Sequence, residues 1–223
     1  MQKKINRLEI GIFREMVVKA LPENDRQYFD FDSYLYAYSM AQDFEIMEKY
    51  LIGYGLKRIL DIGSGIGLTT WYLDRLGYEV VGCDIEPEKY KLNMQTKFCQ
   101  SVLWNILEEN GENLKYVSIF PDKLPFEKES FDAVLAYAVL EHIMPEHLEK
   151  WLGEIQRIIK KNGLIFIFKC PQKLALTEHI SRTLKLGAHE ILYTRHEVNS
   201  LLEKIGFREI HFKQKDFLPY FMG

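Results

Sequence analysis

Cysteine is scarce in this sequence, and its few copies form no pattern that would support metal binding or disulfide pairing. Cys83, Cys99 and Cys170 lie in no Cys-x-x-Cys motif and have no histidine at metal-ligand spacing. A small, odd number of cysteines without a secretory signal is typical of the reducing cytosol. We therefore expect a cytoplasmic protein without a disulfide framework, in which Cys83 and Cys170 pack as small residues at the ends of apolar runs.

Long hydrophobic runs are also absent. The longest uninterrupted apolar stretch is the eight residues 133–140, whereas a membrane-spanning helix needs about 20. The N-terminal segment 1–16 carries basic residues but has no apolar core, because Glu9 and Glu15 interrupt it. We expect no signal peptide and no membrane span. The apolar positions of this segment recur at helical spacing, which favours an amphipathic helix packed on the domain over one lying on a membrane.

No charge of either sign dominates. Lysine and arginine number 29 and aspartate and glutamate 32, which gives a formal net charge of −3. A general nucleic-acid binder usually carries a strongly basic surface, so we expect no nucleic-acid partner. With 47% hydrophobic and 27% charged residues among 223, the composition is that of an ordinary globular protein. The chain is long enough for one large domain with a substantial core.

From residue 57 onward, short apolar runs alternate with segments of helical periodicity. This alternation is typical of a mostly parallel sheet covered by helices on both faces. We expect strands at 58–62, 79–84, 114–119, 131–136, 164–169 and 207–213, with or without a hairpin partner at 217–221. Helices are expected up to 76, and at 87–109, 145–161 and 194–205. The fold class is therefore α/β: a Rossmann-like, doubly wound sheet of six or seven strands, mostly parallel, with an antiparallel C-terminal edge.

The same patterns divide a single domain, residues 1–223, into four segments. Residues 1–56 form an N-terminal helical lid, and residues 57–169 form the core that binds a cofactor. The segment 170–193 has weaker periodicity, and we interpret it as an insertion beside an acceptor site. Residues 194–223 supply a C-terminal helix and strand; the helix opens with the capping box Thr194-x-x-Glu197.

Three glycines stand where the first expected strand turns into a helix. The segment reads Ile-Leu-Asp-Ile-Gly-Ser-Gly-Ile-Gly, and its glycines are Gly63, Gly65 and Gly67. Glycine permits positive φ and lets a ligand approach the backbone closely, while the following helix offers free N–H groups. Asp84 ends the second strand, where a carboxylate can accept hydrogen bonds from both hydroxyls of a ribose. Together these features indicate a cofactor that contains a nucleoside.

Two residues argue against a dinucleotide as that cofactor. The dinucleotide fingerprint requires a small residue three positions after its second glycine, and Leu68 stands there. Asp61 directly precedes the loop, where its charge would oppose a pyrophosphate. A carboxylate at this position suits a cationic group, such as the ammonium of a methionine moiety, unless Asp61 only caps its own loop.

These motifs resemble those of the class I S-adenosylmethionine-dependent methyltransferases, in the small-molecule branch related to the ubiquinone-biosynthesis methyltransferases. ILDIGSGIG resembles their first motif and VVGCDIEPE their second, and later motifs resemble KLPFEKESFDAVLAYAVLEHI, IKKNGLIFIF and EVNSLLEKIGF. The resemblance spans about residues 40–213 of the sequence. It implies S-adenosyl-L-methionine as cofactor, and transfer of its methyl group to a small-molecule acceptor by in-line displacement.

The resemblance also assigns cofactor contacts to the glycine loop and its surroundings. The expected contacts are Asp61, Gly63, Ser64, Gly65, Gly67, Asp84, Ile85 and Tyr137. Asp84 would hold the ribose, Ile85 would lie beneath the adenine, and the backbone of Tyr137 would approach the methionine part. Tyr34 and Tyr38 would share one face of a helix, and would either close over the cofactor carboxylate or pack in the core.

Two positions depart from the family pattern. Family members commonly carry an aspartate, which contacts the adenine amino group, four residues before their Leu-Pro-Phe motif. This chain has Phe120 there, followed by Pro121, so either Asp122 replaces the missing carboxylate or the ring of Phe120 stacks on the adenine. In members that bind a metal, a glutamate stands three residues before the Glu-His pair, where this chain has Ala138. We therefore expect no bound metal.

A hydroxyl acceptor would need a base, whereas a neutral amine would not. His142 follows the fourth strand at the end expected to face the reacting group, and His189 lies in the 170–193 segment. Each is either a candidate catalytic base or a structural residue. We expect a small-molecule acceptor and a monomer or homodimer. A non-catalytic subunit that binds S-adenosylmethionine is the alternative function.

Overall fold

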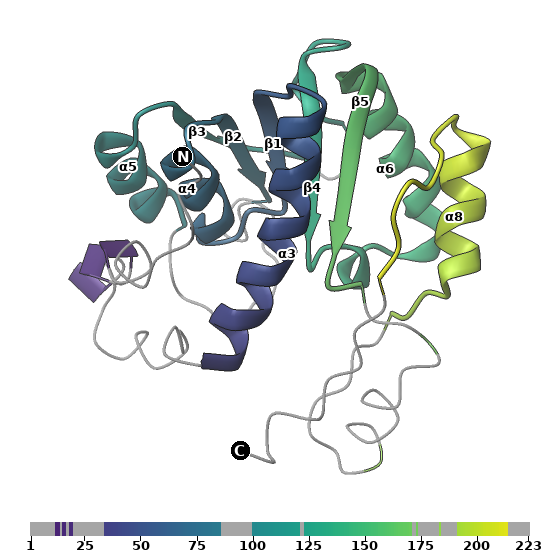
Figure 1. Cartoon of the computed structure of the whole chain (residues 1–223), viewed down its shortest axis with the longest axis horizontal. Coiled ribbons are helices and arrows are strands. Elements are labelled where there is room, and N and C mark those ends of the chain that lie inside the picture. The colour runs from purple at the N-terminus through teal and green to yellow at the C-terminus, as the bar shows by residue number, and fades with distance from the viewer. Residues whose placement is uncertain are drawn as a thin grey trace.

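A computed structural model shows one parallel sheet at the centre of the chain (Figure 1). It describes residues 12–13, 15–16, 18–19, 34–85, 100–120, 123–170, 173, 183 and 191–213, with the backbone alone for 34–39 and 100–101. The strands are β1 (Arg58–Ile62), β2 (Glu79–Asp84), β3 (Leu114–Ser118), β4 (Phe131–Tyr137) and β5 (Ile159–Phe168). Their order is β3-β2-β1-β4-β5, and every neighbouring pair is parallel.

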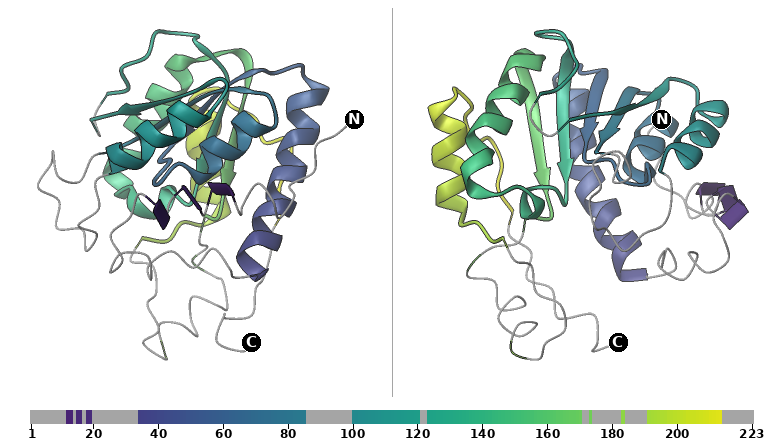
Figure 2. Two further views of the ribbon diagram at one scale, coloured as in Figure 1. Left: turned by 90° about the vertical axis from the view of Figure 1, so that its left-hand side faces the viewer. Right: turned by 180° about the vertical axis from the view of Figure 1, so that it is seen from behind.

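Helices cover both faces of this sheet, as Figures 1 and 2 show. The helices are α3 (Tyr34–Gly53), α4 (Leu68–Arg75), α5 (Gln100–Asn110), α6 (Pro145–Ile158) and α8 (Arg195–Lys204), with a short 3₁₀ turn, η1 (Leu140–His142). On one face, α3, α4 and α5 enclose a hydrophobic core that includes Phe44, Trp71 and Leu107. On the other, α6 and α8 enclose a second core that includes Leu152 and Val198. The expected doubly wound α/β architecture is therefore confirmed.

The two helices of the second face begin as their sequences predict. Pro145 occupies the first turn of α6, where its missing N–H costs nothing. The apolar stripe of that helix is buried at Leu148, Leu152, Ile155 and Ile158. In α8 the capping box is formed: the side chain of Thr194 accepts from the backbone N–H of Glu197, whose carboxylate accepts from the Thr194 N–H.

The boundary between α6 and β5 differs from the prediction. The helix was expected to continue to residue 161, but it ends at Ile158 and the strand begins at Ile159. The backbone N–H groups of Glu129 and Ser130 bond the carbonyls of Arg157 and Ile158, and these contacts hold the chain where it turns into the strand. Lys160 accordingly pairs with Asp132 at 2.7 Å rather than standing in the last helical turn.

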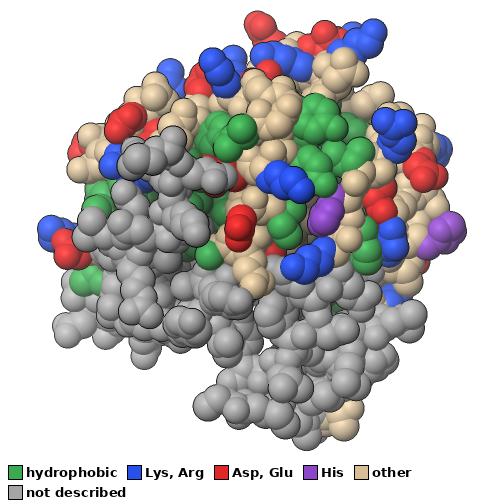
Figure 3. Space-filling view, viewed as in Figure 1, with side chains coloured by type: hydrophobic (Ala, Val, Ile, Leu, Met, Phe, Trp, Pro, Cys, Tyr) green, Lys and Arg blue, Asp and Glu red, His purple; other side chains and the backbone are tan. Residues whose placement is uncertain are grey.

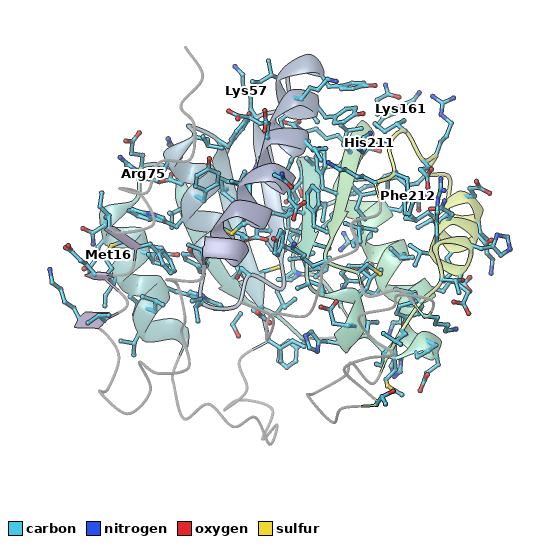
Figure 4. All side chains as sticks on the ribbon, turned by 60° about the horizontal axis from the view of Figure 1, so that its bottom comes forward. Met16, Lys57, Arg75, Lys161, His211 and Phe212 are labelled. Carbon is cyan, nitrogen blue, oxygen red and sulfur yellow. The ribbon has the colours of Figure 1, made fainter. Side chains whose placement is uncertain are left out.

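The expected antiparallel edge is wrong for the part of the chain that the structure describes. Residues 207–213 form no strand, so the sheet has five parallel strands there, not six or seven with an antiparallel edge. Side chains hold this segment instead: Glu209 pairs with Arg195 of α8, and the Arg195 guanidinium lies 3.9 Å from the Phe212 ring centroid. The ring of His211, which Figure 4 labels, lies 5.9 Å from the ring of Tyr50 on α3, measured between centroids. The proposed hairpin partner at 217–221 lies outside the described residues.

The strand order places a reversal between β1 and β4. From β1 the chain proceeds to β2 and β3 on one side, and then returns to β4 and β5 on the other. In open sheets of this kind, ligands bind at such a reversal, beyond the carboxyl ends of the strands. The glycine loop after β1, Asp84 at the end of β2 and Tyr137 at the end of β4 lie at this edge of the sheet.

Candidate functional site

The glycine loop between β1 and α4 is attached to the end of β2. The backbone N–H groups of Gly63 and Ser64 both donate to the carbonyl of Cys83, at 2.8 and 3.0 Å. The N–H of Gly67 donates to the Ser64 carbonyl at 2.8 Å, which closes the turn. All three glycines of the loop have positive φ, a conformation that residues with a Cβ rarely adopt.

The last two glycines of this loop have opposite surroundings. A Cβ on Gly67 would collide with the hydroxyl of Tyr116, which donates to the Gly67 carbonyl at 2.9 Å. A Cβ on Gly65 would meet no atom of the described residues within 4 Å. Behind the loop, the indole N–H of Trp104 donates to the Gly65 carbonyl at 2.9 Å. The protein therefore packs against one side of the loop and leaves the side at Gly65 open to a ligand.

The carboxylate of Asp84 borders the same loop. One oxygen accepts from the N–H of Gly65 at 2.6 Å and the other from the N–H of Ile85 at 2.7 Å. Burial raises the pKa of this carboxyl group, while the two backbone hydrogen bonds and the charge of the nearby His142 lower it. Each carboxylate oxygen can accept a second hydrogen bond, so Asp84 retains capacity for a ligand.

The second acid of the site, Asp61, is almost completely buried, with 1% of its surface exposed. Its Oδ2 accepts from the hydroxyls of Thr69 and Thr70, at 2.5 and 2.7 Å. Its Oδ1 is buried and has no hydrogen-bond partner among the residues that the structure describes. Burial is the main cause that raises the Asp61 pKa to about 6, against the lowering effect of the two hydroxyls. One oxygen thus supports the first turn of α4, and the other is left for a hydrogen-bond donor.

A polar cluster that the sequence reasoning missed lies where β4 and β5 end. The phenol of Tyr137 donates to Oδ2 of Asp43 at 3.3 Å, and Nζ of Lys169 lies 3.4 Å from the same oxygen. Asp43 is 4% exposed and stands on the buried face of α3, between Met40 and Met47. In the sequence, the one signal for Asp43 is that a carboxylate stands within an otherwise apolar helical stripe. The rings of Phe44 and Phe168 contact Tyr137 at centroid distances of 6.3 and 6.0 Å.

The structure describes only some of the remaining residues that the sequence singled out. His142 ends η1, exposed and close enough to Asp84 for its charge to affect that carboxyl group. Tyr34 and Tyr38 belong to the first turns of α3, where only the backbone is described. Asp122 and His189 lie outside the described residues. Within the ranges that are described, no three histidine, cysteine or acidic side chains come together as metal ligands.

Comparison with known proteins agrees with this geometry. Residues 60–167 match a family described as a methyltransferase domain. The mitochondrial ubiquinone biosynthesis O-methyltransferase of Mus musculus is 30% identical over 159 residues, which cover 67% of this chain and 40% of the relative. The demethylmenaquinone methyltransferase of Tropheryma whipplei is 27% identical over 183 residues, covering 72% of this chain and 70% of that one. The chain therefore spans less than half of the mouse relative and more than two thirds of the bacterial one.

Solved structures share the fold. A Pyrococcus horikoshii protein superposes with a TM-score of 0.60 at 20% identity, over 82% of this chain and 89% of that one. The magnesium protoporphyrin IX methyltransferase of Synechocystis, solved with bound S-adenosylhomocysteine, gives 0.54 at 17% identity, over 74% and 72% of the two chains. These identities are low enough that the likeness concerns the fold alone.

The fold is that of an α/β protein with a parallel sheet, and the glycine loop, Asp61 and Asp84 lie together at the ends of β1 and β2. The sequence matches, over residues 60–167 and over 67% of the chain, place it in the class I S-adenosylmethionine-dependent methyltransferases, a family whose cofactor is S-adenosyl-L-methionine. Among the described residues, no helix is long and apolar enough to cross a membrane.

Asp61 should make the stability of the folded chain depend on pH. Its folded-state pKa of about 6 lies above the ordinary value of 3.8. As pH rises, the carboxyl group therefore ionises first in the unfolded chain, and the folded state loses stability relative to the unfolded one. Between pH 4 and pH 7 the free energy of unfolding of the wild type should fall by about 2–3 kcal/mol relative to Asp61→Asn. Urea denaturation of both proteins at the two pH values measures this difference, and a constant difference would contradict the raised pKa.

Proposed function

We propose that this chain transfers a methyl group from S-adenosylmethionine to a hydroxyl group of a small, hydroxylated aromatic acceptor of the quinone type. The observation that carries the cofactor part is Oδ1 of buried Asp61, which has no hydrogen-bond partner among the described residues and precedes the open glycine Gly65 by four positions. A buried carboxylate oxygen of this kind favours a cationic donor. S-adenosylmethionine carries such an ammonium group and, when bound, supplies a methyl group on a sulfonium.

The residues at the strand ends suit the other parts of this cofactor. Asp84, held by the N–H groups of Gly65 and Ile85, is placed to accept hydrogen bonds from the two ribose hydroxyls. The side chain of Ile85 would lie under the adenine. Ser64 is buried in the loop, and its hydroxyl has no partner within the described ranges. We assign it to the methionine part together with Asp61.

Features at the ends of β4 and β5 support an aromatic acceptor with a polar group. Ala138 and Lys169 follow the two strands and have φ values of 55° and 56°, although neither is glycine. Backbone strain of this kind costs about 1–3 kcal/mol and clusters at binding sites. The rings of Phe44, Tyr137 and Phe168 lie beside this edge. Two of the relatives named above are, by their names, a ubiquinone biosynthesis O-methyltransferase and a demethylmenaquinone methyltransferase.

The chain's own contribution to methyl transfer is alignment and proton removal. In-line displacement needs the acceptor oxygen held behind the methyl group with water excluded. A hydroxyl acceptor must also lose its proton, and histidine has a suitable pKa without special tuning. We assign that role to His142 or His189. A non-catalytic subunit that binds S-adenosylmethionine is the alternative, and it would bind the cofactor without turnover.

Turnover distinguishes these two functions. Incubated with S-adenosylmethionine and a panel of catechol, 3,4-dihydroxybenzoate and menadiol, the chain should form S-adenosylhomocysteine with at least one acceptor. Liquid chromatography of the nucleoside product measures the yield. Binding of S-adenosylhomocysteine without turnover on any hydroxylated aromatic would contradict the proposed acceptor class and favour the non-catalytic subunit.

Asp84→Ala should weaken binding of S-adenosylhomocysteine at least tenfold, since hydrogen bonds to a charged group contribute about 1.5–3 kcal/mol each. Isothermal titration calorimetry measures the affinity. Glu79→Ala is the matched control, because Glu79 stands exposed at the opposite end of β2; this variant should bind like the wild type. Equal affinity of the Asp84→Ala protein, with an unchanged circular dichroism spectrum, would mean that the ribose is held elsewhere.

His142→Ala or His189→Ala should lower the turnover number about 10²-fold on an acceptor that the wild type methylates, as expected for loss of a general base. Affinity for S-adenosylhomocysteine should stay within about threefold, which is below 1 kcal/mol. His147→Ala, exposed in the first turn of α6, is the control. Full turnover in both test variants would exclude the two histidines as bases and favour an acceptor that needs no deprotonation.

A further inference from the structure

One buried hydroxyl at the carboxyl edge of the sheet has no role so far. Ser118 ends β3, and its Oγ is buried without a hydrogen-bond partner in the described part of the chain. Buried hydroxyl groups in folded proteins are nearly always paired. The hydroxyl of Ser130, by contrast, donates to the Glu127 carbonyl at 2.8 Å. An unpaired hydroxyl at a ligand-binding edge indicates that its partner is a ligand.

The strand register places Ser118 beside Asp84. The two residues are direct partners in the parallel pairing of β2 with β3, and neighbouring strands lie about 4.8 Å apart. Two positions earlier, the partners are Gly82 and Tyr116, and the Tyr116 hydroxyl reaches the glycine loop at Gly67. Side chains alternate along a strand, so Ser118 points to the same face of the sheet as Tyr116.

The side chain of Asp84 lies on the same face of the sheet as Ser118 and Tyr116. Its carboxylate accepts from the N–H of Gly65 in the glycine loop, just as Tyr116 contacts Gly67. Ser118 and Asp84 are therefore adjacent side chains, both facing the loop that borders the cofactor. Phe120, two residues further on, is 58% exposed and brings no hydrogen-bonding group to this position.

We propose that the hydroxyl of Ser118 hydrogen-bonds a ribose hydroxyl of S-adenosylmethionine, next to the carboxylate of Asp84. The inference rests on the family's cofactor and is independent of the acceptor. A hydroxyl both donates and accepts, whereas the ionised carboxylate of Asp84 only accepts. Ser118 thus supplies the donor that Asp84 lacks, and the pair holds the ribose from two adjoining strands.

Calorimetry with S-adenosylhomocysteine and its 2′-deoxy and 3′-deoxy analogues tests this contact. Ser118→Ala should weaken binding of S-adenosylhomocysteine about three- to tenfold, the range of one neutral hydrogen bond. The loss should disappear with the analogue that lacks the contacted hydroxyl. Ser118→Thr, which keeps a hydroxyl at the strand end, should retain most of the affinity, and Ser130→Ala should bind like the wild type.

Three outcomes would overturn the proposal. In the first, Ser118→Ala binds S-adenosylhomocysteine as tightly as the wild type. In the second, it loses the same factor with all three ligands, which would show a structural role or a contact to another part of the cofactor. If Ser118→Ala fails to fold, Ser118→Cys replaces it, because a thiol is only a weak hydrogen-bond donor, and either of these two results with that variant would overturn the proposal. Absence of any binding by the wild type would overturn both this contact and the cofactor assignment.

Discussion

The attachment of the glycine loop to β2 is the constraint on which the site depends. Two loop N–H groups share the carbonyl of Cys83, a third donates to Asp84, and the Gly65 carbonyl accepts from Trp104. These bonds join the ends of β1 and β2 to the start of α5. The loop therefore holds its shape through the protein alone, and a ligand meets a surface that it does not have to organise.

Much of this architecture follows from local sequence signals. The first four strands were predicted because each is an apolar run that ends in a turn, and α8 because Thr194 and Glu197 form a capping box that is local to four residues. The end of α6 was not predictable in this way, since the amides of residues 129–130, distant in sequence, bond its last carbonyls. Residues 207–213 have a strand-like pattern, but side-chain contacts to α8 and α3 hold them without a backbone ladder.

The residues of the site also fall into two groups, those that a local sequence motif predicts and those that only the structure reveals. The sequence identified the three loop glycines and the acids Asp61 and Asp84 because each lies within a few residues of the end of a predicted strand. Asp43 and Lys169 were missed because their ion pair joins α3 to the end of β5, and neither residue carries a motif. Ser118 gives no signal in the sequence either. Only the register with Asp84 and the absence of a partner for its hydroxyl single it out.

The ion pair between Asp43 and Lys169 also bears on how the chain is made. Asp43 lies on a helix that leaves the ribosome early, yet the ammonium that neutralises it belongs to Lys169, which directly follows β5 and is synthesised much later. A carboxylate resists burial until its partner is present. The helix is therefore expected to remain loosely attached during synthesis, and to settle on the sheet only after β5 has joined β4. Its docking is then a late step in folding, which closes the face of the sheet over the completed core.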